Sequence, residues 1–133
     1  MALPADDDDF FAAFRDGRVA ASDFDHRAHL RAAIAALERL PFLEACIAVR
    51  DGLGHIARQV GKPALYHETL TIAFMALVAE RLDGHDGGWA SLLDAHPELF
   101  DRGLVGRHYR AETLASDVAR RRFVLADARS EIA

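Results

Sequence analysis

The feature that most constrains the fold is the apolar run from Leu70 to Ala79, "LTIAFMALVA". It lies in the segment 64–82, which contains no glycine or proline and is apolar on nearly every side of a helix. A helix that is hydrophobic all round is normally buried among other helices. The run therefore predicts a central helix in an all-α protein.

Glycine and proline divide the rest of the chain into further helical segments. We expect helices over residues 6–15, 22–40, 41–60, 64–82 and 89–95, a short helix at 97–100, and a last helix after Ser116 covering 117–127. Ser22 followed by Asp25 resembles a capping box, and Pro41 suits a first helical position. No stretch alternates with the period of two that is typical of an exposed strand. The prediction is an all-α, single-domain helical bundle of about five to six helices over residues 1–133.

The overall charge and the cysteine content limit the classes of function. The net charge of -5 argues against nucleic acid as the main partner, because phosphate binding needs a basic surface. The single cysteine allows no internal disulfide, and Cys46 lies in an apolar helical stripe, where we expect a buried, unreactive thiol. No apolar run has transmembrane length, and the acidic N-terminus is unlike a secretory signal. We therefore expect a cytoplasmic protein that does not act at a membrane.

Two polar clusters stand at the starts of apolar helical segments. "DHRAHL" contains His26 and His29, and "YHETLT" contains His67 and Glu68. If the 22–40 and 41–60 helices are antiparallel and the 64–82 helix reverses direction again, the 22–40 and 64–82 helices have their N-termini at the same end of the bundle. The sequence therefore predicts that the two clusters converge.

The first chemical interpretation of this convergence is a metal site. His26, His29 and His67 can hold a divalent transition metal such as zinc, iron, manganese or nickel, with one position open for water. Glu68 is the proposed fourth ligand or general base, and His67 the second catalytic candidate. Consecutive helical residues diverge by about 100°, so Glu68 either reaches the site from its flank or misses it. Thr71, four residues after His67, is placed to support it.

A metal-free pocket and a purely structural role are the alternatives. Two converging helix N-termini favour a small anionic ligand, and histidines there can do acid–base work. Alternatively, helix-terminal histidines only bond neighbouring carbonyl groups. The protein is then a non-catalytic interaction module, with a homodimer as the expected assembly. The function predicted from the residues is therefore a metal-dependent enzyme or small-ligand binder, with the interaction module as the competing hypothesis.

The order of three segments resembles a functionally uncharacterised group of small helical bacterial proteins. These segments are "HRAHLRAA", "LYHETLTIAFM" and "HYRAETLASDVARRRFVLAD", which resemble the patterns HxxHL, YHETxT and HYSxxxL followed by SxxAR. The resemblance adds Tyr66, Thr69, His108 and Tyr109 to the candidate site residues. The ligand-binding candidates are Tyr66, Thr71, His108 and Tyr109. This chain has Arg110 where the pattern has serine, and "LAD" where a proline precedes the aspartate. The resemblance implies no reaction.

Two further segments have a functional and a structural interpretation. The glycine-rich stretch "RGLVGRHY" could fold over the site as a lid. The four aspartates at 6–9 could bind a cation, but a solvated helix start is the stronger expectation, because carboxylates complement the helix dipole.

Gly52 and Gly54 predict a weak point in the middle of the 41–60 helix.

Overall fold

The computed structural model describes residues 3–128 and is all-α, as the sequence predicts. Five of its α-helices have eight residues or more, two are short, and four 3-10 helices connect them; no strand occurs within residues 3–128. The α-helices are α1 (Asp7–Arg15), α2 (His26–Arg39), α3 (Phe42–Gln59), α4 (Glu68–Leu82), α5 (Gly88–Ala95), α6 (Ala111–Leu114) and α7 (Asp117–Arg121). The 3-10 helices are η1 (Ala21–Asp23), η2 (Pro63–Leu65), η3 (Pro97–Phe100) and η4 (Val105–His108).

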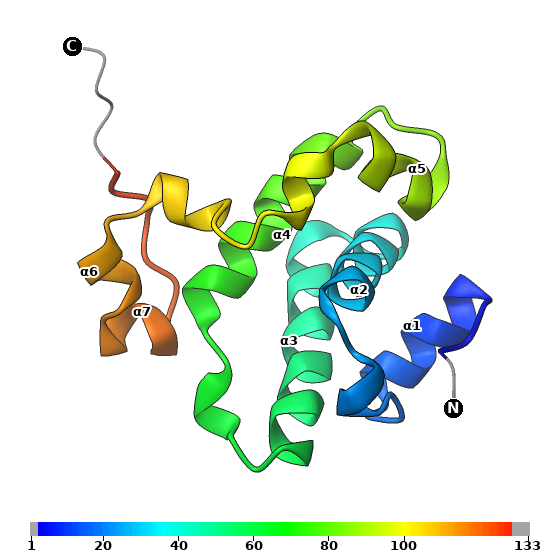
Figure 1. The fold of residues 1–133 in the computed structure, drawn as a ribbon, viewed down its shortest axis with the longest axis horizontal. Coiled ribbons are helices and arrows are strands. Elements are labelled where there is room, and N and C mark those ends of the chain that lie inside the picture. Colours follow the sequence, from blue (N-terminus) through cyan, green and yellow to red (C-terminus); the bar gives the residue numbers. More distant parts are fainter. Residues whose placement is uncertain (1–2, 129–133) are drawn as a thin grey trace.

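Helix α2 lies at the centre of the core. It packs against α1, α3, α4, α5 and η3 (Figure 1). Leu30 and Ile34 are fully buried, and each contributes roughly 1.5–3 kcal/mol by leaving water. The helix also buries the alanines of its middle section, whose small side chains let neighbouring helices approach closely. This position holds the first turn of α2, with His26 and His29, against α4.

Helix α1 is held on α3 by a close contact at Gly52. Phe10 and Phe14 are buried, and a Cβ atom added at Gly52 would lie 2.2 Å from the Phe14 ring. Phe14 also stacks on Phe24, with 5.3 Å between the ring centroids. Gly52 therefore makes room for an aromatic ring, and α3 runs through it as one continuous helix.

The acidic start of α1 has specific partners. Asp6 caps the helix by accepting from the Asp9 N–H group, as expected for a helix start. Asp7 accepts from the guanidinium of Arg31 at 2.7 Å, and Arg31 is buried over the Phe10 ring. Asp6 thus caps α1, and Asp7 attaches it to α2.

Three helix boundaries differ from the sequence prediction. Helix α2 begins at His26 because the side chain of Asp25, not that of Ser22, caps it by accepting from the Ala28 N–H group at 2.8 Å. Helix α4 begins at Glu68, four residues later than expected, because the chain before it forms η2 and the side chain of His67 is its N-cap. Helix α7 ends at Arg121, and the chain then becomes extended.

Helix α4 connects the two ends of the molecule. It packs against α2, α3, α7 and η4, and Figure 1 shows α6 and α7 at the end far from α1. Within residues 3–128, no helix combines the length and the apolar composition needed to cross a membrane.

Candidate functional site

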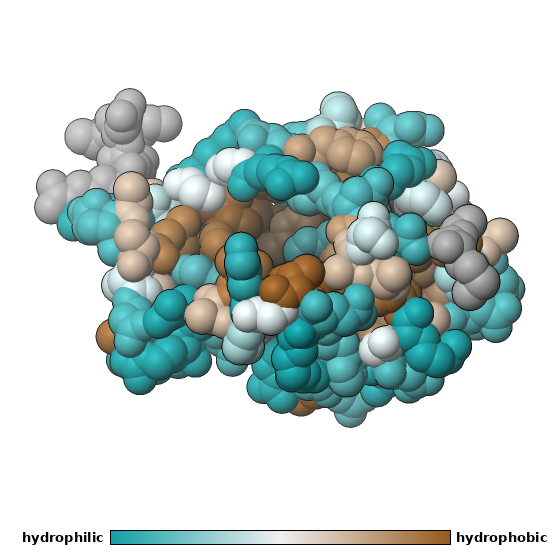
Figure 2. All heavy atoms as spheres, turned by 60° about the horizontal axis from the view of Figure 1, so that its bottom comes forward, coloured by the Kyte–Doolittle hydropathy of each residue, from teal (hydrophilic) through white to brown (hydrophobic). Residues whose placement is uncertain are grey.

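A pocket of about 370 Å³ lies between α2, α3, α4 and the segment 101–105. Pockets of this size commonly bind small molecules. Figure 2 shows a hollow with hydrophobic walls between more hydrophilic rims. The apolar lining comes from Leu53, Ile56, Ala57, Val60, Leu65, Leu70, Phe74, Leu104 and Val105. Most of the wall is therefore apolar.

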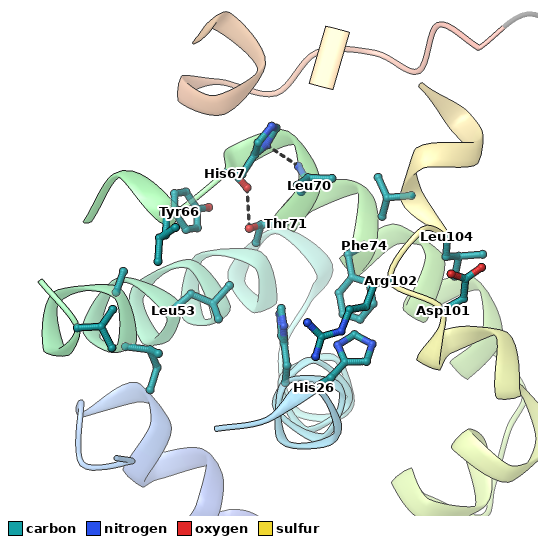
Figure 3. Close-up of a pocket in the computed structure, with 16 residues that line it drawn as sticks. His26, Leu53, Tyr66, His67, Leu70, Thr71, Phe74, Asp101, Arg102 and Leu104 are labelled. Carbon is teal, nitrogen blue, oxygen red and sulfur yellow. Dashed lines mark hydrogen bonds between the residues drawn. The ribbon is translucent and has the colours of Figure 1, made fainter. Parts of the chain in front are cut away.

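The structure brings five of the predicted site residues to this pocket: His26, His29, Tyr66, His67 and Thr71. It leaves Glu68, His108 and Tyr109 outside the lining. The two polar clusters thus approach the same cavity, because the first turn of α2 and the chain entering α4 lie on two of its sides (Figure 3).

His26 and His29 are adjacent on α2. Their ring centroids are 6.3 Å apart, and the Phe74 ring of α4 lies 5.2 Å from that of His29. The Nε2 atom of His26 lies 3.2 Å from the carbonyl oxygen of Leu99, to which it can donate. The Nε2 atom of His29 is buried and has no hydrogen-bond partner within residues 3–128. A buried polar atom without a partner costs about 1–3 kcal/mol.

The surroundings of His29 favour its neutral form. Burial is the main cause, and electrostatic interactions with His26 and Arg102 add to it, so that the pKa of His29 falls from 6.5 to about 4. At neutral pH the His29 imidazole is therefore uncharged, and one ring nitrogen can donate a hydrogen bond while the other accepts one. Arg102 was not among the residues predicted from the sequence.

His67 holds the start of α4 in place. Its Nδ1 atom accepts from the Leu70 N–H group at 3.1 Å, and its Nε2 atom donates to the Leu114 carbonyl oxygen, 2.8 Å away in α6. Figure 3 shows its ring turned away from His26. Both ring nitrogens are therefore used by contacts within the fold, as in the structural alternative.

Tyr66 and Glu68 form a pair on the other side of the α4 start. The Tyr66 hydroxyl donates to the Glu68 carboxylate at 2.5 Å. Burial, followed by this hydrogen bond, raises the pKa of Tyr66. Burial also raises the pKa of the Cys46 thiol to about 11, with a smaller contribution from Glu68, which fits the expected unreactive thiol. Glu68 thus interacts with Tyr66 and Cys46, and Glu68 itself does not line the pocket.

The two threonines of "YHETLT" also make contacts within the fold. Thr71 donates to the backbone carbonyl of His67 at 2.8 Å, so it stabilises the first turn of α4 and not the imidazole ring. Thr69 is fully buried; its hydroxyl donates to the Arg122 carbonyl and accepts from the Val124 N–H group. Of the polar side chains of this motif, His67 and Thr69 therefore join α4 to the C-terminal part of the described chain.

His108 and Tyr109 serve the same C-terminal part. The backbone carbonyl of His108 accepts from the N–H groups of Asp127 and Ala128, while its side chain is exposed. The buried Tyr109 hydroxyl donates to the Val124 carbonyl at 2.7 Å. His108 and Tyr109 therefore hold the segment 124–128 in place and do not line the pocket.

The predicted three-histidine metal centre can be compared with this geometry. Within residues 3–128, no three His, Cys, Asp or Glu side chains lie close enough together to hold one ion. His26 and His29 are neighbours, but His67 directs its ring nitrogens to Leu70 and Leu114. The described residues therefore do not form the expected ligand set, and metal binding stays a prediction that elemental analysis of the purified protein can test.

The segment 101–105 supplies the pocket wall that the sequence analysis did not specify. Asp101, Arg102, Leu104 and Val105 line the cavity, and Figure 3 shows Arg102 pointing into it, on the side of His26. The glycine-rich composition had suggested a segment folding over the site. No local pattern identifies which of its arginines points inward, because that depends on the contacts of η4 with α4.

Comparisons of the chain with protein-family models, curated proteins and solved structures found no match.

Proposed function

We propose that this single helical bundle binds a small, mostly apolar molecule in the pocket between α2, α3 and α4. The observation that carries the proposal is an apolar cavity of about 370 Å³ whose lining includes His29, an imidazole whose buried Nε2 atom has no hydrogen-bond partner within residues 3–128. Unsatisfied buried polar atoms are uncommon in folded proteins, and functional sites are among the places where they occur. A ligand group that reached this atom would remove the cost of leaving it unpaired.

The contacts of the other candidates support binding more than catalysis. His67 uses both ring nitrogens within the fold. Glu68, which does not line the pocket, accepts from Tyr66, which does. A general acid or base has to reach the proton that it transfers. The pocket is therefore proposed as a binding site in which His26 and His29 supply the polar contacts.

The proposal is tested with the neutral fluorescent probe N-phenylnaphthylamine, whose emission rises in apolar surroundings. The informative variant is Leu70→Asp, because Leu70 lines the pocket and is 38% exposed, so that the fold tolerates a polar side chain there. The matched control is Leu43→Asp: Leu43 is 74% exposed, lies outside the pocket and also belongs to the first turn of a helix. A carboxylate suits both first turns.

We expect the wild type and Leu43→Asp to bind the probe with equal affinity, and Leu70→Asp to bind it about tenfold more weakly. The loss corresponds to removing part of the apolar contact of one leucine. If the wild type does not enhance the probe's fluorescence, the interaction-module hypothesis, with its structural histidines, becomes the better account. Equal weakening in both variants would also argue against the pocket.

A further inference from the structure

The geometry points to a specific class of ligand: an amphipathic anion, with an apolar tail along the α3–α4 wall and a carboxylate-like head at Arg102. This inference rests on the proposed function and adds the chemistry of the head group. Arg102 lines the pocket, points into it (Figure 3), and forms no ion pair within residues 3–128. A guanidinium group binds carboxylates through paired, charge-assisted hydrogen bonds.

The acidic neighbour of Arg102, Asp101, already has hydrogen-bond partners of its own. Asp101, the one carboxylate among the described lining residues, accepts from the Arg107 guanidinium at 2.6 Å and from the Gly103 N–H group at 2.8 Å. Arg102 is the one arginine or lysine in the same lining. The described part of the pocket therefore offers a cation that its own carboxylate does not neutralise.

The neighbouring imidazole of His29 suits the same head group. His29 is close enough to Arg102 for the two to interact electrostatically, and its Nε2 atom lacks a partner within the described residues. As a neutral imidazole, His29 can donate one hydrogen bond to a carboxylate that Arg102 has attracted. Charge and hydrogen bonding would then come from different side chains on the same side of the pocket.

The rest of the lining matches an uncharged tail. Leu53 on α3 and Leu70 on α4 contribute apolar walls away from Arg102 (Figure 3). At about 30 Å³ for each water-sized group, the cavity has room for on the order of twelve such groups. A ten-carbon chain with a carboxylate is a suitable probe of this size.

The experiment compares decanoate with decanol as competitors of N-phenylnaphthylamine near pH 7.5. The two have the same tail, and only decanoate is charged. They are tested on the wild type, on Arg102→Gln, and on Arg50→Gln as a control of equal charge change. Arg50 is exposed on α3 and does not line this pocket. Thermal melts of all three proteins check that the variants are folded.

We expect the wild type and Arg50→Gln to bind decanoate at least about tenfold more tightly than decanol, and Arg102→Gln to lose this preference. Decanol competing as well as decanoate in the wild type would overturn the inference, as would a preference that survives in Arg102→Gln. In both cases probe binding itself would leave the proposed function standing. Absence of probe binding to the wild type would overturn both.

Discussion

Replacing His67 separates a structural from a ligand-binding role for the "YHETLT" motif. His67→Ala removes the hydrogen bond that caps α4 at Leu70 and the one to the Leu114 carbonyl oxygen. A lost helix cap costs about 1 kcal/mol, and a lost hydrogen bond to a partly buried carbonyl costs about another. We therefore expect the free energy of unfolding to fall by about 2 kcal/mol, and the melting temperature by roughly 8 °C.

His67→Asn is the matched variant, because asparagine can cap the helix but is too short to replace the contact with Leu114. We expect it to lose about half as much stability as His67→Ala, and His108→Ala, at an exposed side chain, to lose almost none. Urea denaturation followed by circular dichroism measures all three. A His67→Ala variant that melts with the wild type yet no longer binds N-phenylnaphthylamine would contradict the structural role, since His67 would then be a ligand-binding residue.

Two further predictions concern His29 and Gly52. Since the pKa of His29 is about 4 in the folded protein and 6.5 ordinarily, the unfolded chain takes up the proton first as the pH falls, and the stabilisation present above 6.5 is lost towards 4. Urea denaturation at about pH 7 and about pH 4 should show the wild type losing on the order of 3 kcal/mol more than His29→Gln; equal losses would contradict the neutral imidazole. Gly52→Ala would place a Cβ atom 2.2 Å from the Phe14 ring and should destabilise the protein by about 1–3 kcal/mol. Gly54→Ala, where the nearest contact would be 3.4 Å from the Arg58 guanidinium, should be neutral or stabilising, and equal melting temperatures for the two variants would argue against the close helix contact.

The periodic apolar patterns predicted the helices well where tertiary contacts agree with them. Helices α2 and α3 follow the expected segments because their apolar positions recur at helical spacing, and α4 does so because it is apolar on nearly every side. The start of α4 was wrong because a histidine side chain acts as its cap, a role that sequence patterns seldom assign to histidine. The end of α7 was wrong because Arg122 and Val124 bond to Thr69, a contact between segments far apart in the chain.

The sequence predicted which histidines approach the candidate site, but not how the His67 ring is oriented or that Arg102 lines the pocket. The starts of two helical segments carry His26, His29 and His67, and helix order alone indicated that they would approach one another. Helical geometry also allowed Glu68 to miss the site, and Glu68 lies outside the lining. The orientation of the His67 ring and the inward position of Arg102 depend on the packing of the C-terminal half against α4, which one sequence does not specify.

The most direct test of the account is a nuclear magnetic resonance titration that observes the ring nitrogens of the histidines while decanoate is added. We predict that the His29 signals shift in a saturable manner, because its ring lines the pocket and its Nε2 atom is unpaired within the described residues. His55, which lies outside this pocket, should not respond. Unchanged His29 signals at saturating decanoate, or equal shifts at His29 and His55, would contradict a ligand site between α2, α3 and α4.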